Sequence, residues 1–281
     1  MNLRFRARWY YTIEIAFDWS KALKVVILCG GFGTRIRDVS EDIPKPMIPI
    51  GRYPILWHIM KWYASHGHKE FILCLGYKSH VIKDFFLNYE AHTADFTIVL
   101  GQSAQVQFHK NHKESDWKVT LAETGLKAMT GARVHRIREY IGQDEEFMLT
   151  YGDGVGDIDI EKLLAFHRKQ GKVLTVTGVR PPGRFGEIVT NPGGLVSEFN
   201  EKPQATAGRI SGGFFVCKRR LFDYLNDQEN LVFEEGPMKQ LVADRQVALY
   251  PHDGFWQPMD TSREYQMLND IYARDEAPWV R

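Results

Sequence analysis

The chain lacks several features that mark common protein classes. Its 281 residues include only three cysteines, Cys29, Cys74 and Cys217, which are far apart and form no Cys-x-x-Cys pair. This usage favours a reducing compartment, and we expect a cytoplasmic protein. Lys and Arg number 36 against 35 Asp and Glu, without the basic excess of a nucleic-acid binder. No apolar run is long enough to cross a membrane. We therefore expect neither nucleic acid nor membrane as a partner.

The standard phosphate and nucleophile motifs are also missing. The glycine-rich run 30–33 is followed by Thr34 and Arg35, whereas a P-loop needs Lys directly after its last glycine. The dinucleotide fingerprint fails because Ile36 stands where its third glycine belongs. A Gly-x-Ser-x-Gly nucleophile motif is absent.

What the chain does have is a glycine turn directly after a strand. The apolar stretch 24–28 predicts a buried strand, and Gly30, Gly31 and Gly33 follow it. Glycines let backbone N–H groups approach a ligand without a Cβ in the way. Arg35 and, ten residues later, Lys45 add positive charge. The combination predicts a triphosphate site; the alternative is a tight turn with incidental charge.

Apolar runs alternate with helical patterns through the first two thirds of the chain. We predict strands at 71–75, 96–100, 147–151 and 173–177, and helices at 55–66, 80–89 and 160–170. This alternation predicts an α/β fold with a doubly wound, mainly parallel sheet. Ligands of such sheets bind beyond the carboxyl ends of the strands. Gly30 and Asp153 both follow a predicted strand, so we expect them to share one crevice.

The pattern changes after about residue 180. Turn signals separate short predicted strands at 186–190, 195–200 and 209–217, which indicates a small antiparallel region over about 180–260. A helix is predicted at 262–274. At the other end, residues 1–22 mix charges with aromatics and are interpreted as an N-terminal arm outside the core. We expect one domain over 23–281.

Two aspartates are candidate metal ligands. Asp153 follows a predicted strand and has glycines on both sides. Asp260 precedes Thr261 and Glu264, which match a capping box, so the Asp260 side chain can point away from the helix start. Two carboxylates together with substrate phosphates are a common way to hold Mg²⁺. The structural alternatives are a turn aspartate for Asp153 and a helix cap for Asp260.

Further cations lie beside glycines or turns. Lys202 follows Glu201 and precedes a proline, and its ammonium suits a phosphate monoester as a point charge. Arg133 lies in a helix for which Thr130 is the predicted cap. The alternatives are a surface ion pair for Lys202 and a position on the helix surface for Arg133.

Taken together, these motifs resemble the sugar-1-phosphate nucleotidyltransferases. The resemblance covers about residues 23–281, and its motifs are specific in order and spacing. The supporting segments are GGFGTR (30–35), KPM (45–47), PILWHIMKWY (54–63), GYKSHVIKDFF (76–86), MTGAR (129–133), YGDGV (151–155), PPGRFG (181–186), EKP (201–203), GGFFV (212–216) and GFWQPMDT (254–261).

The resemblance implies a role for each motif. Arg35, Lys45, Asp153 and Asp260 are the implied catalytic residues, and the two aspartates would hold Mg²⁺. The implied nucleotide-binding residues are Leu28, Cys29, Gly30, Gly31, Phe32, Gly33, Thr34, Arg35, Lys45, Arg133 and Gly152. The implied sugar-phosphate-binding residues are Gly186, Glu201, Lys202, Ser211, Gly212 and Trp256, where Ser211 replaces the Asn usual in the family.

The implied reaction transfers a cytidylyl group from CTP to α-D-glucose 1-phosphate and gives CDP-glucose and pyrophosphate, a step toward surface polysaccharide. The resemblance further implies a Rossmann-like nucleotidyltransferase fold and a homo-oligomer, with a hexamer as one form. Two alternatives stay open. One is the same transfer with UTP, dTTP or another hexose 1-phosphate. The other is a non-catalytic nucleotide-binding regulatory subunit.

Overall fold

The computed structural model describes residues 22–33, 36, 42–101, 106–109, 113–181, 187–191, 195–200 and 208–280, with the backbone alone at 187–190 and 196–200. Five candidate site residues lie outside this range: Thr34, Arg35, Gly186, Glu201 and Lys202. The predicted N-terminal arm, apart from its last residue, lies outside it too, and the division into an arm and one domain stays a prediction.

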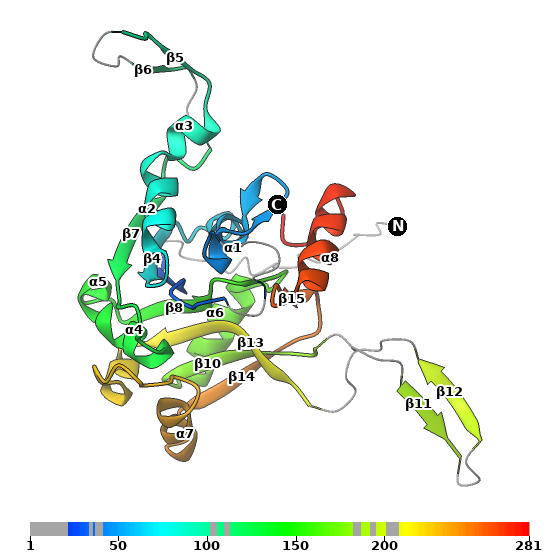
Figure 1. Ribbon diagram of the computed structural model, residues 1–281. Coiled ribbons are helices and arrows are strands. Elements are labelled where there is room, and N and C mark those ends of the chain that lie inside the picture. The colour runs from blue at the N-terminus through cyan, green and yellow to red at the C-terminus, as the bar shows by residue number, and fades with distance from the viewer. Residues whose placement is uncertain are drawn as a thin grey trace, which may run out of the picture.

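The centre of the molecule is a seven-stranded sheet in the order β14-β10-β13-β8-β1-β4-β7 (Figure 1). All its strands run in one direction except β13, which is antiparallel to both of its neighbours. The predicted mainly parallel α/β sheet is therefore confirmed. The strands are β1 Val25–Leu28, β4 Glu70–Leu75, β7 Lys118–Glu123, β8 Glu146–Tyr151, β10 Leu174–Val179, β13 Ile210–Lys218 and β14 Val247–His252.

The strand predicted at 209–217 is confirmed as β13, and it is antiparallel to both of its neighbours. It lies inside the central sheet between β8 and β10, a place that the sequence pattern did not predict. The residues from Gly212 to Cys217 are all buried. A strand buried in this way has helices on both faces and a hydrogen-bonded strand on each side, as in the centre of a sheet. Its antiparallel direction places its first residues at the carboxyl end of β8.

Each face of the sheet packs against its own set of helices. Along β1, Val25 and Ile27 belong to one core cluster, whereas Val26 and Leu28 belong to the other. This is the alternation expected of a strand buried on both sides. The first cluster includes residues of α1 (Ile55–Ser65), α6 (Ile160–Gln170) and α8 (Ser262–Ala273). The second includes residues of α4 (Thr130–Arg136), α5 (Arg138–Ile141), the 3-10 helix η3 (Arg219–Tyr224) and α7 (Gly236–Ala243).

Local sequence determines the ends of two helices. The Asp159 carboxylate accepts the backbone N–H of Lys162 at the start of α6, and Gly171 ends this helix with a left-handed φ of 64°. The bounds of α6 coincide with the predicted helix. Thr261 and Glu264 form the predicted capping box at the start of α8.

Two hairpins stand apart from the central sheet (Figure 1). One pairs β5 (Phe96–Ile98) with β6 (Val106–Phe108) beyond α2 (Ser79–Leu87) and α3 (Tyr89–Thr93). The other pairs β11 (Glu187–Thr190) with β12 (Val196–Asn200). The strand predicted at 96–100 therefore exists in part but does not join the sheet. All of its side chains are exposed, so its apolar character did not reflect burial.

Within the described ranges, no helix combines the length and apolarity needed to cross a membrane. The three cysteines are all buried and unpaired.

Candidate active site

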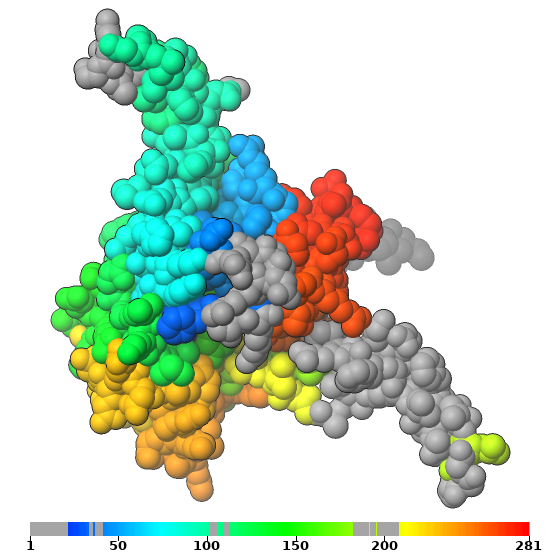
Figure 2. All heavy atoms as spheres, viewed as in Figure 1, coloured from blue at the N-terminus to red at the C-terminus, as the bar shows by residue number. Residues whose placement is uncertain are grey.

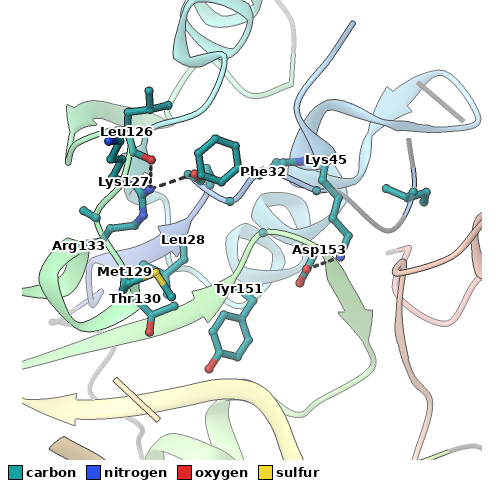
Figure 3. Close-up of a pocket in the computed structure, with 18 of the residues that line it drawn as sticks. Leu28, Phe32, Lys45, Leu126, Lys127, Met129, Thr130, Arg133, Tyr151 and Asp153 are labelled. Carbon is teal, nitrogen blue, oxygen red and sulfur yellow. Dashed lines mark hydrogen bonds and ion pairs between the residues drawn. The ribbon is translucent and has the colours of Figure 1, made fainter. Parts of the chain in front are cut away.

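A cavity of about 420 Å³ opens at the carboxyl ends of β1 and β8 (Figure 3). Residues after β1, after β7 and after β8 line it together with parts of two distant loops. The predicted crevice therefore exists. The candidate nucleotide and metal residues on its wall are 28–33, Lys45, Arg133, Gly152, Asp153 and Asp260.

Two of its glycines are required by close packing. A Cβ on Gly30 would lie 2.1 Å from Nη1 of Arg133, and a Cβ on Gly152 would lie 2.8 Å from the backbone oxygen of Leu28. Neither position has room for a side chain. The glycine turn and the loop after β8 are thus held close together, and their backbones face the cavity.

Arg133 organises this end of the cavity. Its Nη1 donates to the backbone oxygen of Leu75 and to Oγ1 of Thr124, both at 2.8 Å. Its Nη2 donates to the backbone oxygens of Gly30 at 3.0 Å and Leu126 at 3.4 Å. Burial lowers the pKa of Arg133 from its ordinary value. Arg133 therefore does not lie on the helix surface. It connects the loops that follow β1 and β7 with the end of β4 by hydrogen bonds.

A short ladder aligns the two candidate metal ligands. β15 (Trp256–Pro258) pairs with β9 (Gly154–Gly156). Next to this ladder, the backbone N–H of Met259 donates to the carbonyl of Asp153 at 2.8 Å. Because Thr261 and Glu264 cap α8, the side chain of Asp260 is not needed as a cap. The two aspartates, 107 positions apart, are thereby brought to one wall of the cavity.

Lys45 lies between these aspartates. It begins the 3-10 helix η2 (Lys45–Met47), and its Nζ lies 2.6 Å from Oδ2 of Asp153 and 2.5 Å from Oδ1 of Asp260. Burial alone would lower the pKa of Lys45, but the two carboxylates outweigh it and the pKa is raised. One ammonium facing two carboxylates leaves a formal charge of −1 on the trio.

The donor set fits a hard divalent cation. Carboxylate oxygens are the ligands that Mg²⁺ prefers, and Mg²⁺ is usually bound by one or two of them together with substrate phosphates. Within the described part of the chain, no group of three or more His, Cys, Asp or Glu residues gathers at a possible metal site. The carboxylates of Asp153 and Asp260 fit the protein part of such a coordination shell.

Comparisons with known proteins identify the family of the chain. A family model described as nucleotidyl transferase matches residues 24–267. The chain belongs to this family. This confirms the resemblance noted in the sequence, and the matched residues include the glycine turn, Lys45, Asp153 and Asp260.

Alignments with similar proteins cover nearly the full length of this nucleotidyl transferase. The glucose-1-phosphate cytidylyltransferase of Salmonella typhimurium is 44% identical over 92% of this chain and 98% of its own length. A probable glucose-1-phosphate cytidylyltransferase of Bacillus subtilis is 42% identical over 92% of this chain and 99% of its own. The crystal structure of HddC from Yersinia pseudotuberculosis complexed with GMP-PN aligns with a TM-score of 0.64 at 21% identity, covering 89% of this chain and 99% of that one. The last similarity supports the fold.

The sequence did not reveal one polar cluster at the rim of the nucleotidyl transferase cavity. Tyr151 and Thr130 line the cavity, and the hydroxyl of each donates to the Glu234 carboxylate. Burial, followed by the nearby Glu234, raises the pKa of Tyr151. Thr130 also accepts the backbone N–H of Phe233 at 2.9 Å. Its predicted capping role was wrong, because the helix begins at Thr130 itself, Met129 is the cap residue, and the Thr130 hydroxyl is used across the loop.

The predicted sugar-phosphate residues that are described lie next to one another. The indole Nε1 of Trp256 donates to the backbone oxygen of Gly212 at 2.7 Å. The Ser211 hydroxyl accepts the backbone N–H of Gly213 at 3.4 Å. None of these residues belongs to the wall of the cavity. Trp256 lies on β15, which leads to Asp260, so this group adjoins the carboxylate end of the site.

Proposed function

We propose that the chain catalyses CTP + α-D-glucose 1-phosphate → CDP-glucose + pyrophosphate. The observation that carries this proposal is the identity of 44% and 42%, over almost the full length, with the glucose-1-phosphate cytidylyltransferases named above. The site supports it, because one cavity joins a glycine turn to two carboxylates and a lysine.

The chemistry needs no general base. The phosphate of glucose 1-phosphate is already ionised at neutral pH, and one of its oxygens forms the new bond to the α-phosphorus of CTP. The bond from this phosphorus to the oxygen that bridges to the β-phosphate breaks, and its electron pair leaves on pyrophosphate. Since both reactants are anions, catalysis depends on holding them in line and balancing their charge.

We assign Mg²⁺ as the cofactor and Asp153 and Asp260 as its protein ligands. When bound, Mg²⁺ neutralises phosphate charge and favours departure of pyrophosphate. The glycine turn directs backbone N–H groups at the nucleotide, and Arg133 keeps that turn in place. Arg35, Glu201 and Lys202 keep the phosphate and sugar roles implied by the resemblance.

We propose that Lys45 changes partners during binding. It contacts both carboxylates at 2.6 and 2.5 Å, so it competes with a divalent cation for the same oxygens. The triphosphate offers Lys45 a second anionic partner, which is its implied role. Nucleotide and metal together therefore displace Lys45 from the aspartates more easily than metal alone.

A substrate panel tests the function. Pyrophosphate release is measured with CTP, UTP, dTTP, ATP and GTP against glucose 1-phosphate, and then with CTP against several hexose 1-phosphates. We expect the highest kcat/KM for CTP with glucose 1-phosphate. Preference for another nucleotide or hexose would replace the substrate assignment. Absence of pyrophosphate release with every pair would instead support a non-catalytic regulatory subunit.

We further propose that the chain forms a homo-oligomer. The β5–β6 hairpin projects from the body of the molecule (Figure 2), and Ile98, Leu100 and Val106 on it are 42%, 85% and 42% exposed. An isolated two-stranded hairpin is marginally stable in water, so a second copy would cover this apolar surface. Light scattering tests this: Ile98→Asp should lower the mass relative to the unmodified protein, and an unmodified protein that is monomeric would contradict it.

A further inference from the structure

The connection between β10 and β13 is held at both of its ends by one carboxylate. Arg180 directly follows β10, and Arg209 directly precedes β13. Nε of Arg180 lies 2.9 Å and Nη2 of Arg209 lies 2.8 Å from the same oxygen, Oδ1 of Asp253. These three residues, which we call the Asp253 cluster, close the base of the connection that carries the β11–β12 hairpin away from the central sheet (Figure 1).

Arg209 is also bonded to the sheet itself. Its Nη1 donates to the backbone oxygens of Gly178 on β10 at 3.0 Å and of His252 on β14 at 2.8 Å. The guanidinium groups of Arg209 and then of Arg180 lower the pKa of the Asp253 carboxyl, so this carboxyl is ionised at neutral pH. An isolated surface ion pair contributes little, but a network of several charges with good geometry contributes more.

Asp253 lies on the turn between β14 and β15, and this turn leads to the metal carboxylates. Next to it, Nε2 of His252 lies 3.0 Å from Oδ1 of Asp157, just after β9. A Cβ on Gly254 would lie 2.5 Å from the same Oδ1 atom, so the turn packs closely against the end of β9. β15 then pairs with β9 and is followed by Asp260. A continuous set of contacts therefore joins the base of the connection to the carboxylate end of the site.

The connection matters for the second substrate. The residues with implied sugar-phosphate roles include Gly186, Glu201 and Lys202 within it and Ser211 and Gly212 just after it. In the proposed reaction, an oxygen of the sugar phosphate must lie in line with the bond that breaks. A small displacement of the groups that hold the sugar phosphate would therefore weaken productive binding.

Building on the proposed function, we propose that Asp253 is a positioning residue for the sugar 1-phosphate. Through Arg180 and Arg209 it fixes both ends of the connection relative to the turn that precedes β15, and so relative to Asp260. Asp253 does not belong to the cavity wall, and it acts on the substrate through the chain segments that it holds. Its loss should affect the sugar phosphate and leave the nucleotide unaffected.

Steady-state kinetics of pyrophosphate release test this division. For Asp253→Ala, we expect the KM for glucose 1-phosphate to rise about 3- to 10-fold, with the KM for CTP unchanged. Asp253→Glu keeps the charge and should recover most of the loss. The matched control is Asp116→Ala, because Asp116 is 55% exposed, lies 2.5 Å from Nζ of Lys69 and is not on the cavity wall. This control should leave both KM values unchanged.

A double-mutant cycle tests whether Asp253 acts through Arg180. Arg180→Ala alone should also raise the KM for glucose 1-phosphate. Added to Asp253→Ala, it should raise this KM no further, because the contact is already lost. A further rise of the same size would show that Arg180 binds the substrate independently of Asp253, which would overturn the positioning role.

Hydrogen exchange provides a readout that does not depend on turnover. Asp253→Ala should speed exchange of the backbone N–H groups at 178–180 and 208–211, whereas Asp116→Ala should not. Unchanged exchange, an unchanged KM for glucose 1-phosphate or an equal rise in both KM values would each overturn the proposal. If the unmodified protein releases no pyrophosphate, the proposed reaction is contradicted, and the exchange measurement still decides whether Asp253 holds the connection.

Discussion

Two lysines of this protein make short contacts with carboxylates but have different surroundings. Lys45 lies on the cavity wall between Asp153 and Asp260. Lys61 lies on α1, and its Nζ is 2.7 Å from Oε1 of Glu114. By distance alone the two sites look alike.

The carboxylate that faces Lys61 is closed off from solvent, because the Glu114 side chain is only 9% exposed; we call this the closed region. Its Nζ lies 5.5 and 5.9 Å from the ring centres of Trp57 and Trp117, and Oε2 of Glu114 accepts the hydroxyl of Tyr89 at 3.2 Å. One positive and one negative charge cancel, as expected for a pair that only stabilises structure.

The Lys45 site is unbalanced and open. It holds one carboxylate more than its ammonium neutralises, and the side chains of Asp153 and Asp260 are 36% and 28% exposed. Excess negative charge beside a cavity favours binding of a cation. Charge balance and access, rather than contact distance, therefore distinguish the proposed binding site from the structural ion pair.

The largest expected effect comes from Asp153→Asn. Losing the carboxylate removes a proposed metal ligand, and we expect the rate of pyrophosphate release to fall about 100- to 1000-fold. Thermal unfolding should show a folded protein. Turnover at the unmodified rate would end the assignment of Asp153 as a metal ligand.

Glu114→Ala should affect stability rather than activity. It leaves Lys61 without its carboxylate. We expect the free energy of unfolding to fall by about 2 kcal/mol. This is less than for a fully buried pair, because the Lys61 side chain is 24% exposed. Urea unfolding measures the loss, and kcat at a temperature where the variant is folded should not change. A strong loss of kcat there would mean that the two regions are coupled.

The closed region should also respond to acid. Burial lowers the pKa of His58, next to Trp57 on α1, to about 4. Because the pKa of His58 is lower in the folded than in the unfolded state, protonation favours unfolding. The free energy of unfolding is therefore highest above about pH 6.5 and decreases as the pH falls toward 4. Between about pH 6.5 and 5 the free energy of unfolding should drop by about 2 kcal/mol for this residue. Urea unfolding at both pH values checks it, and His58→Gln should show a shallower drop; an equal drop would contradict it.

The smallest expected effect is on metal binding at the Lys45 site. Lys45→Met removes the ammonium that competes for the two carboxylates, so Mn²⁺ without nucleotide should bind about tenfold more tightly. Lys61→Met is the matched control and should leave Mn²⁺ binding unchanged. Electron paramagnetic resonance measures free Mn²⁺ in both. Weaker Mn²⁺ binding by Lys45→Met would show that Lys45 supports the metal site instead of competing with it.

The sequence predicted those elements of the fold and of the candidate site that depend on local patterns. The helix 160–170 has its own cap residue and terminal glycine, and the capping box after Asp260 indicated that this aspartate points elsewhere. The contact of Lys45 with both aspartates was not predicted, because it depends on the packing of three distant segments. The insertion of β13 into the central sheet was not predicted, and the role of Thr130 was predicted wrongly, for the same reason: each is decided by a partner far away in sequence.

The register of β10 and β13 has a consequence for how such a chain can change. Val179 at the end of β10 pairs with Ile210 at the start of β13, so the connection between them leaves and re-enters the sheet at the edge that carries the cavity. Lengthening a connection whose ends are already anchored costs little, since closure entropy grows only with the logarithm of its length. Changes in the length of this connection would therefore leave the sheet and the paired ends of β10 and β13 as they are.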